Sequence, residues 1–301
     1  MLGLLPPPLL GVLVLTLMIL NTVLAASLII LTLPLRLLMP GRLGNSVLPR
    51  LMMWFAENWA TVHNRGIYRL LPRIRWSIDY PPGLDRKGWY MISANHQSWV
   101  DIMVLFYVFN RRIPFLKYFL KQELLWIPFL GLALWCMDFP FMKRYSKQQL
   151  ARHPELKGKD METTRRSCAR FQHTPVSVIN FLEGTRNTPA RKGTVDTPYR
   201  HLLKPKAGGM AFVLSALGER MHCLLDVTII YPDGIPSFWQ FASGQVRNIV
   251  VDIRVREIPA DCFSHDYETD AAFRESFQSW VAGIWAEKDQ LLDQPTTSTM
   301  H

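Results

Sequence analysis

The first 35 residues carry no charged side chain, and positions 9–33 are almost all Leu, Ile, Val, Ala or Thr. An apolar run of this length predicts a helix able to cross a bilayer core. A secretory signal peptide fits less well, because the run is long and no positive region precedes it. Asn21 and Thr22 leave open two short helices that dip into one leaflet, and a buried core helix is the other alternative. We expect residues 1–40 to be a membrane anchor.

Residues 41–73 have a different pattern, in which apolar and aromatic positions mix with arginines. Trp54, Trp59 and Tyr68 suit a headgroup boundary, so we expect an amphipathic interfacial helix here, although a helix that packs on the core fits equally well. Arginines at 36, 42 and 50 follow the apolar run. By the positive-inside rule, the rest of the chain lies on the cytoplasmic side, which predicts a place at a bacterial inner membrane.

From residue 74 onward, short apolar runs alternate with segments of helical periodicity. Strand patterns cover residues 74–80, 89–94, 114–120, 139–142, 175–182, 224–231 and 245–255. Helical patterns cover residues 98–109, 160–172, 207–217 and 271–292. Residues 124–137 are uncharged but too few to span a bilayer, which indicates a buried or membrane-dipping helix. We therefore predict an α/β domain over 74–294, with a mixed, mainly parallel sheet flanked by helices, and a disordered tail at 295–301.

The formal net charge of +10 is unevenly spread. Residues 143–206 hold fifteen Lys or Arg and five Asp or Glu, which accounts for the whole excess. Next to a membrane anchor, this basic segment favours a phosphorylated substrate or an anionic lipid surface over nucleic acid. Four scattered cysteines and eight histidines without ligand spacing predict neither a disulfide framework nor a metal site.

The heptad Asn95-His96-Gln97-Ser98-Trp99-Val100-Asp101 joins a strand pattern to a helical one. A neutral imidazole can take a proton from a hydroxyl, and a carboxylate on its other nitrogen fixes the tautomer. Ser98 and Asp101 also have the spacing of a helix-capping box. On that alternative, Asp101 serves the helix and His96 is an ordinary loop residue, and the heptad alone leaves both interpretations open.

Three further polar segments follow predicted strands or precede a helix. Glu183-Gly184-Thr185-Arg186 offers a tight turn and a guanidinium fork suited to phosphate. Lys143-Arg144 ends another strand pattern, and the segment from Lys204 through Lys206 to Gly209 precedes a helix that can hold an anion. Each of these is also what an ordinary solvated turn looks like.

The order of these motifs resembles the glycerolipid acyltransferase family that makes phosphatidate. Its first block, Asn-His-x4-Asp, matches residues 95–101, and its second, a Phe-rich strand ending in arginine, matches 139–144. The third block matches Phe181 and residues 183–186, with Leu182 where the family has proline. The fourth matches 228–232 loosely, and the stretches 117–122, 140–146 and 159–168 are closest to an enterobacterial, YihG-type subgroup.

The resemblance implies transfer of a fatty acyl group from acyl-CoA or acyl carrier protein to the free hydroxyl of lysophosphatidate, without a cofactor. His96 would be the general base and Asp101 its orienting partner. Arg186, with Arg144, would hold the phosphate, Glu183 would position Arg186 or the acceptor, and Gly184, Thr185, Lys143 and Lys206 would complete the substrate site. Residues 124–137 would line the acyl groove.

Three alternatives stay open for this chain. Another lysophospholipid can be the acceptor. A non-catalytic membrane protein that binds anionic lipid through its basic segment needs the charge but not His96, Asp101 or Glu183. A hydrolase is disfavoured, because the chain has no Gly-x-Ser-x-Gly elbow.

Overall fold

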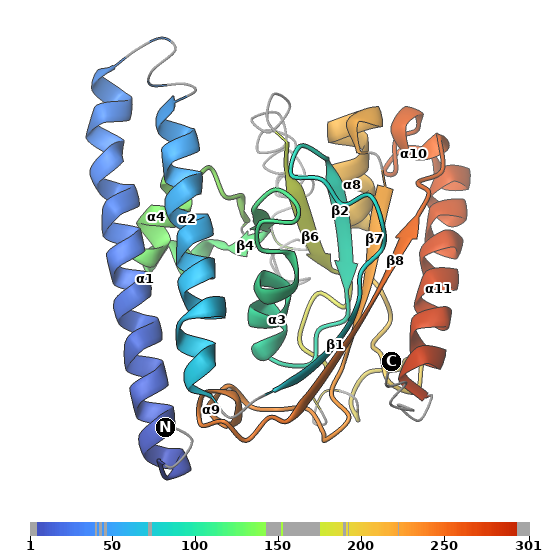
Figure 1. Cartoon of the computed structure of the whole chain (residues 1–301). Coiled ribbons are helices and arrows are strands. Elements are labelled where there is room, and N and C mark those ends of the chain that lie inside the picture. Colours follow the sequence, from blue (N-terminus) through green and yellow to red (C-terminus); the bar gives the residue numbers. More distant parts are fainter. Residues whose placement is uncertain are drawn as a thin grey trace.

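A six-stranded sheet with the order β1-β8-β7-β2-β6-β3 organises the chain in the computed structural model (Figure 1). The structure describes residues 5–39, 41, 44, 47–71, 74–142, 152, 175–188, 191, 193–221 and 223–293. All neighbouring strands are parallel except β7 and β8, so the predicted mixed, mainly parallel sheet is confirmed. The strands are β1 (Arg75–Asp79), β2 (Tyr90–Ala94), β3 (Leu116–Tyr118), β6 (Ser177–Phe181), β7 (Cys223–Ile230) and β8 (Asn248–Arg256).

Helices cover both faces of the sheet. All five residues of the central strand β2 are buried, so its alternate side chains enter two different cores. Ile92 packs with residues of α3 (Val100–Phe109), whereas Met91 packs with α8 (Gly208–Leu217) and α11 (Ala271–Asp293). The remaining short helices are η3 (Ile67–Leu70), η4 (Gln122–Trp126), α4 (Leu130–Cys136), η6 (Gly218–Arg220), α9 (Phe238–Ala242) and α10 (Asp261–Ser264).

Two long helices, α1 (Pro7–Leu38) and α2 (Leu48–Arg65), run side by side along the domain (Figure 1). In the described residues, α1 is the one helix long and apolar enough to cross a membrane. It is continuous through Asn21, so the variant with two short helices is not the one that forms. Asn21 Nδ2 donates to the Trp59 carbonyl oxygen at 3.1 Å, and Trp59 Nε1 donates to Thr22 Oγ1 at 2.9 Å. The polar residues of the apolar run therefore join the two helices.

Some elements differ from the sequence patterns. The run expected at 114–120 divides between β3 and β4 (Leu120–Lys121), and β4 pairs with β5 (Phe141–Met142) in a separate small sheet. Residues 124–137 form η4, a turn and α4 rather than one helix, because Phe129 has φ +61°, outside the helical region. The short helix α9 was not among the expected elements, although Ser237 and Gln240 form a capping box at its start. The helix expected at 160–172 and the tail at 295–301 lie outside the described residues.

Candidate active site

His96 and Asp101 form a pair at the carboxyl end of β2. His96 Nδ1 lies 2.9 Å from Asp101 Oδ2. The histidine side chain is 12% exposed and the aspartate side chain 1%. The imidazole also stacks on Phe181, with ring centroids 4.0 Å apart. With Nδ1 occupied by a carboxylate, Nε2 is the nitrogen available to a ligand.

Asp101 serves the helix start and the histidine at the same time. Its Oδ2 accepts the backbone amides of Gln97 at 2.6 Å and Ser98 at 2.8 Å, as an acid in the first turn of α3 does. Its Oδ1 accepts the hydroxyl of Tyr231 at 2.6 Å. The two interpretations of the heptad are therefore compatible, because the contacts that hold the carboxylate at the helix start also aim it at His96.

Glu183 is buried beside His96 rather than in contact with a solvent-facing cation. Its Oε1 accepts the backbone amide of His96 at 2.8 Å, and its Oε2 accepts the backbone amide of Leu203 at 3.0 Å. Burial is the main cause that raises the pKa of this carboxyl to about 7, and the two amides act against it. Both oxygens bind main chain, so Glu183 holds the loop that carries His96.

The turn after β6 places Gly184, Thr185 and Arg186 beside this pair. Gly184 has φ +66°, and a Cβ there would lie 3.1 Å from Lys206 Cδ, so the glycine lets the lysine side chain pass close to the backbone. The Arg186 guanidinium lies 4.6 Å from the centre of the Trp99 ring. Lys143 and Arg144, which were expected at the same site, lie outside the described residues.

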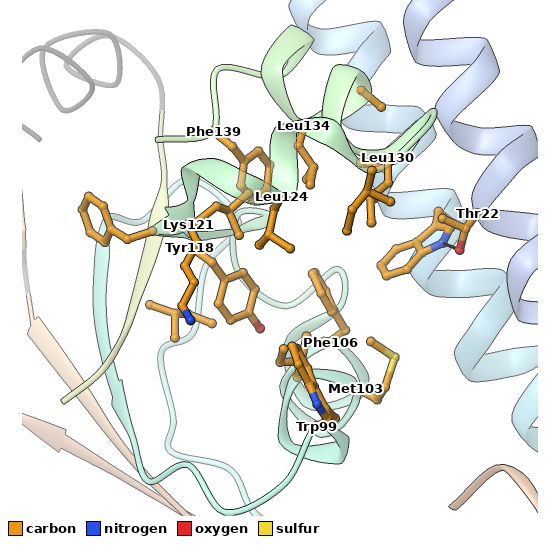
Figure 2. A pocket seen from close by; sticks show the side chains of 18 of the residues that line it. Thr22, Trp99, Met103, Phe106, Tyr118, Lys121, Leu124, Leu130, Leu134 and Phe139 are labelled. Atoms are coloured by element: carbon orange, nitrogen blue, oxygen red, sulfur yellow. Dashed lines mark hydrogen bonds between the residues drawn. The ribbon is translucent and has the colours of Figure 1, made fainter. Parts of the chain in front are cut away.

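A cavity of about 920 Å³ has His96 in its wall. Figure 2 shows other side chains that line it, among them Leu124, Leu130 and Phe106. The expected segment 124–137 lines it through Leu124, Leu130 and Leu134, among others. Unexpectedly, so does the predicted anchor α1, through residues that include Met18 and Ile29. Gly184, Thr185 and Arg186 join His96 in the wall of the cavity. A histidine in the wall of a cavity lined mainly by apolar side chains suits a reaction on a molecule with a long apolar chain.

Several residues of this site had no decisive signal in the sequence. Tyr231 lies in the loosely matched fourth block, and its contact with Asp101 appears only in the fold. Asn187 donates its backbone amide to the His96 carbonyl oxygen at 2.7 Å. Lys121 and Arg191 also line the cavity. Their positions depend on which strands are neighbours, and periodicity does not reveal this.

The same His-x4-Asp spacing occurs a second time in the chain, at His265 and Asp270. His265 Nδ1 lies 2.8 Å from Asp270 Oδ2, much as in the first pair. The side chain of His265 is 48% exposed, and neither residue lines the cavity. Location, and not spacing, distinguishes the two pairs.

Comparison with known proteins gives one family. A family model described as "Acyltransferase" matches residues 79–233, slightly more than half of the chain. Lysocardiolipin acyltransferase 1 of Danio rerio is 25% identical over 68% of this chain and 52% of its own length. The mouse 1-acyl-sn-glycerol-3-phosphate acyltransferase epsilon is 24% identical over 85% of this chain and 69% of its own.

The curated relatives extend beyond the matched region. The chain spans between 52% and 73% of their lengths. Among solved structures, the 1-acyl-sn-glycerophosphate acyltransferase PlsC of Thermotoga maritima is 17% identical, with a TM-score of 0.49, over 91% of this chain and 95% of that one.

Proposed function

Since the chain belongs to the acyltransferase family, we propose that it moves a fatty acyl group from acyl-CoA or acyl carrier protein to the free hydroxyl of lysophosphatidate, giving phosphatidate. The observation that carries this proposal is the buried His96–Asp101 pair, whose histidine lines a mainly apolar cavity. A thioester is already activated, so the reaction needs a base for the acceptor hydroxyl rather than a nucleophilic residue.

In the proposed step, His96 Nε2 takes the proton of the acceptor hydroxyl as its oxygen attacks the thioester carbonyl carbon. A tetrahedral oxyanion forms, and its collapse makes the new ester while the carbon–sulfur bond breaks. The imidazolium then returns the proton to the leaving thiolate, so histidine ends neutral. Asp101 stabilises the imidazolium through Nδ1, at 2.9 Å.

Arg186 is the cation we assign to the acceptor phosphate. It lines the cavity beside Thr185 and is stacked on Trp99, so the guanidinium is held in one orientation. A planar fork can bind two phosphate oxygens. Lys206, whose side chain lies along Gly184, adds positive charge at the same turn. We also propose that Arg144 helps to hold the phosphate and that Lys143 belongs to the substrate site, although both residues lie outside the described part of the chain.

Another lysophospholipid is the second candidate acceptor. A relative of this chain is named for lysocardiolipin, and another for 1-acylglycerol-3-phosphate. A matrix of acceptors against acyl-CoA and acyl carrier protein decides between them. The highest activity with lysophosphatidate supports lysophosphatidate as the acceptor. The highest activity with a lysophospholipid that has a phosphodiester headgroup supports the second candidate.

For the membrane, we propose that α1 lies along one leaflet and does not cross the bilayer. At 1.5 Å per residue, its 32 residues extend about 48 Å, more than a hydrocarbon core of about 30 Å. Both ends contact the catalytic domain: a Cβ at Gly11 would lie 2.9 Å from Trp239, and Arg36 pairs with Asp138 at 3.2 Å. If α1 crossed the bilayer, the parts of the catalytic domain that contact its two ends would therefore lie on opposite sides of the membrane, and the domain between them would lie in the hydrocarbon core.

The exposed face of α1 supports this arrangement. Large apolar side chains cover that face at both ends and near its middle, and η4, the turn after it and α4 add Trp126, Phe129 and Trp135. An exposed apolar surface of this kind suits insertion among the acyl chains of the membrane lipids. We further propose that the catalytic domain lies on the cytoplasmic side of a bacterial inner membrane. We also propose that the chain belongs to the YihG-type subgroup.

The direct test uses membranes that contain the full chain, labelled acyl-CoA and lysophosphatidate. His96→Ala should lower the rate of phosphatidate formation by about 10²- to 10⁴-fold at equal protein level. His265→Ala is the matched control, because it removes the exposed histidine of the second pair. Equal rates for the wild type and His96→Ala contradict the assignment. Salt-sensitive vesicle binding without turnover supports the non-catalytic alternative, and release of free fatty acid alone supports a hydrolase.

A further inference from the structure

Tyr118 lines the cavity, and its buried hydroxyl has no hydrogen-bond partner among the described residues. It is the last residue of β3, is 8% exposed and lines the cavity wall. No described residue offers its oxygen a hydrogen bond. Figure 2 shows the hydroxyl directed into the cavity. A buried phenol normally finds a partner, so the missing one points to a ligand atom.

The phenol lies next to the reacting end of the cavity. Its ring stacks with Phe181 at 6.1 Å between centroids, and Phe181 stacks with His96 at 4.0 Å. The centre of the Phe106 ring lies 5.7 Å from the centre of the Tyr118 ring. The hydroxyl is therefore carried by the third ring in a row that starts at the proposed base.

Other buried polar atoms lack partners among the described residues, but their settings differ. Ser93 and Ser177 are buried in strands and do not line the cavity. His63 lines it, yet its Nδ1 contacts the Trp59 carbonyl oxygen at 2.9 Å, which places the imidazole between α1 and α2. Tyr118 alone of these belongs to the ring stack on His96.

The chemistry of the hydroxyl is that of a neutral donor. Burial, with a smaller effect from Asp101, raises the pKa of Tyr118 well above its usual value, so the phenol keeps its proton at neutral pH. The cavity around it is lined mainly by apolar side chains. Along an acyl chain bound there, the carbonyl oxygen next to the reacting centre is the acceptor, and the rest is hydrocarbon.

We propose that the Tyr118 hydroxyl donates a hydrogen bond to a carbonyl oxygen of the acyl substrates, and so is a substrate-binding residue of the transfer reaction. This inference rests on the proposed function. The carbonyl has two sources: the thioester of the donor and the ester of the chain already on the lysolipid. In the first case the bond helps hold the reacting carbonyl, and in the second it sets the register of the acceptor.

The test compares wild type and Tyr118→Phe with two acceptors, lysophosphatidate and its ether-linked analogue, which lacks the ester carbonyl. We expect kcat/KM with lysophosphatidate to fall about 3- to 10-fold, the size of one neutral hydrogen bond. An equal fall with the ether acceptor assigns the bond to the thioester. A fall confined to the ester acceptor, mainly in KM, assigns it to the lysolipid.

Stability separates this role from a structural one. Because the hydroxyl has no partner to lose in the part of the chain that the structure describes, Tyr118→Phe should unfold at a Tm no lower than that of wild type. Tyr80→Phe is the control, since its hydroxyl donates to the Val108 carbonyl oxygen at 3.3 Å outside the cavity, and its kcat/KM should stay at the wild-type value.

Two results overturn this inference and leave the proposed function in place. One is a kcat/KM of Tyr118→Phe that is less than about 2-fold below that of wild type for both acceptors. The other is a Tm of Tyr118→Phe that is low enough to account for the lost activity. Wild-type protein that makes no product with any donor overturns the proposed function, and the inference with it.

Discussion

The backbone amide of His96 donates a hydrogen bond to Glu183 Oε1 at 2.8 Å, across 87 positions of sequence. The two residues follow β2 and β6, which are parallel neighbours in the sheet. The glutamate of the third block therefore fixes the main chain that carries the histidine of the first. We therefore expect Glu183 to position the proposed base, whereas the sequence had suggested that it positions Arg186 or the acceptor.

The first prediction concerns Glu183→Gln. The amide group of glutamine would face one of the two backbone amides and leave it without an acceptor, at a cost of about 1–3 kcal/mol. The loop of His96 should shift, so we expect kcat to fall about tenfold while KM for the acceptor stays within about twofold. Steady-state kinetics measure both. The control is Glu287→Gln on the surface of α11, and a raised KM with unchanged kcat argues for a substrate contact instead.

The same carboxyl predicts a pH dependence of stability. Its pKa rises from 4.5 to about 7 on folding, chiefly through burial. Between these values the folded state binds more protons than the unfolded state, so its contribution to the free energy of unfolding falls as pH rises. The loss approaches about 3 kcal/mol above pH 7.

Denaturant unfolding of wild type and Glu183→Gln at about pH 5 and pH 8 measures this effect. Wild type should lose stability relative to the variant at the higher pH. A difference between the two proteins that does not change with pH means that Glu183 titrates normally.

The third prediction concerns Tyr231→Phe. The change removes the hydrogen bond to Asp101 Oδ1, a contact of 2.6 Å with a buried carboxylate. We expect the free energy of unfolding to fall by about 1.5–3 kcal/mol, and kcat by about tenfold because Asp101 orients His96 less firmly. Tyr199→Phe is a suitable comparison, since its hydroxyl reaches the Ala282 carbonyl oxygen at 3.4 Å, far from the pair. If Tyr231→Phe keeps the wild-type kcat, the hydrogen bond from Tyr231 is not needed to hold Asp101 in place against His96.

The fourth prediction concerns the path of α1. If the helix lies along one leaflet, both ends of the chain are on the same side of the membrane. Protease added outside sealed, inside-out vesicles should digest tags at both termini. Protection of the N-terminal tag, with loss of the C-terminal one, indicates a helix that crosses the bilayer.

Much of the architecture was predictable because local patterns depend on local physics. Alternating strands and helices predicted the sheet, and the end of β2 was recognised as a place for chemistry. The uncharged run at 124–137 was expected in the acyl groove and lines the cavity. By contrast, the segments around residues 143–174, where two basic site residues were expected, lie outside the described part.

The sequence by itself determined which residue types were available: a histidine with a carboxylate five positions later, a Glu-Gly-Thr-Arg turn and an apolar N-terminus. It contains the histidine–carboxylate spacing twice, at His96 and at His265. The order of the motifs already selected His96, and the tertiary structure shows how that pair differs from the other: strand order brings Glu183 and Tyr231 to it and leaves the pair at His265 partly exposed. Only the tertiary structure decided that α1 lines the cavity, since packing between distant segments depends on shape that periodicity does not encode.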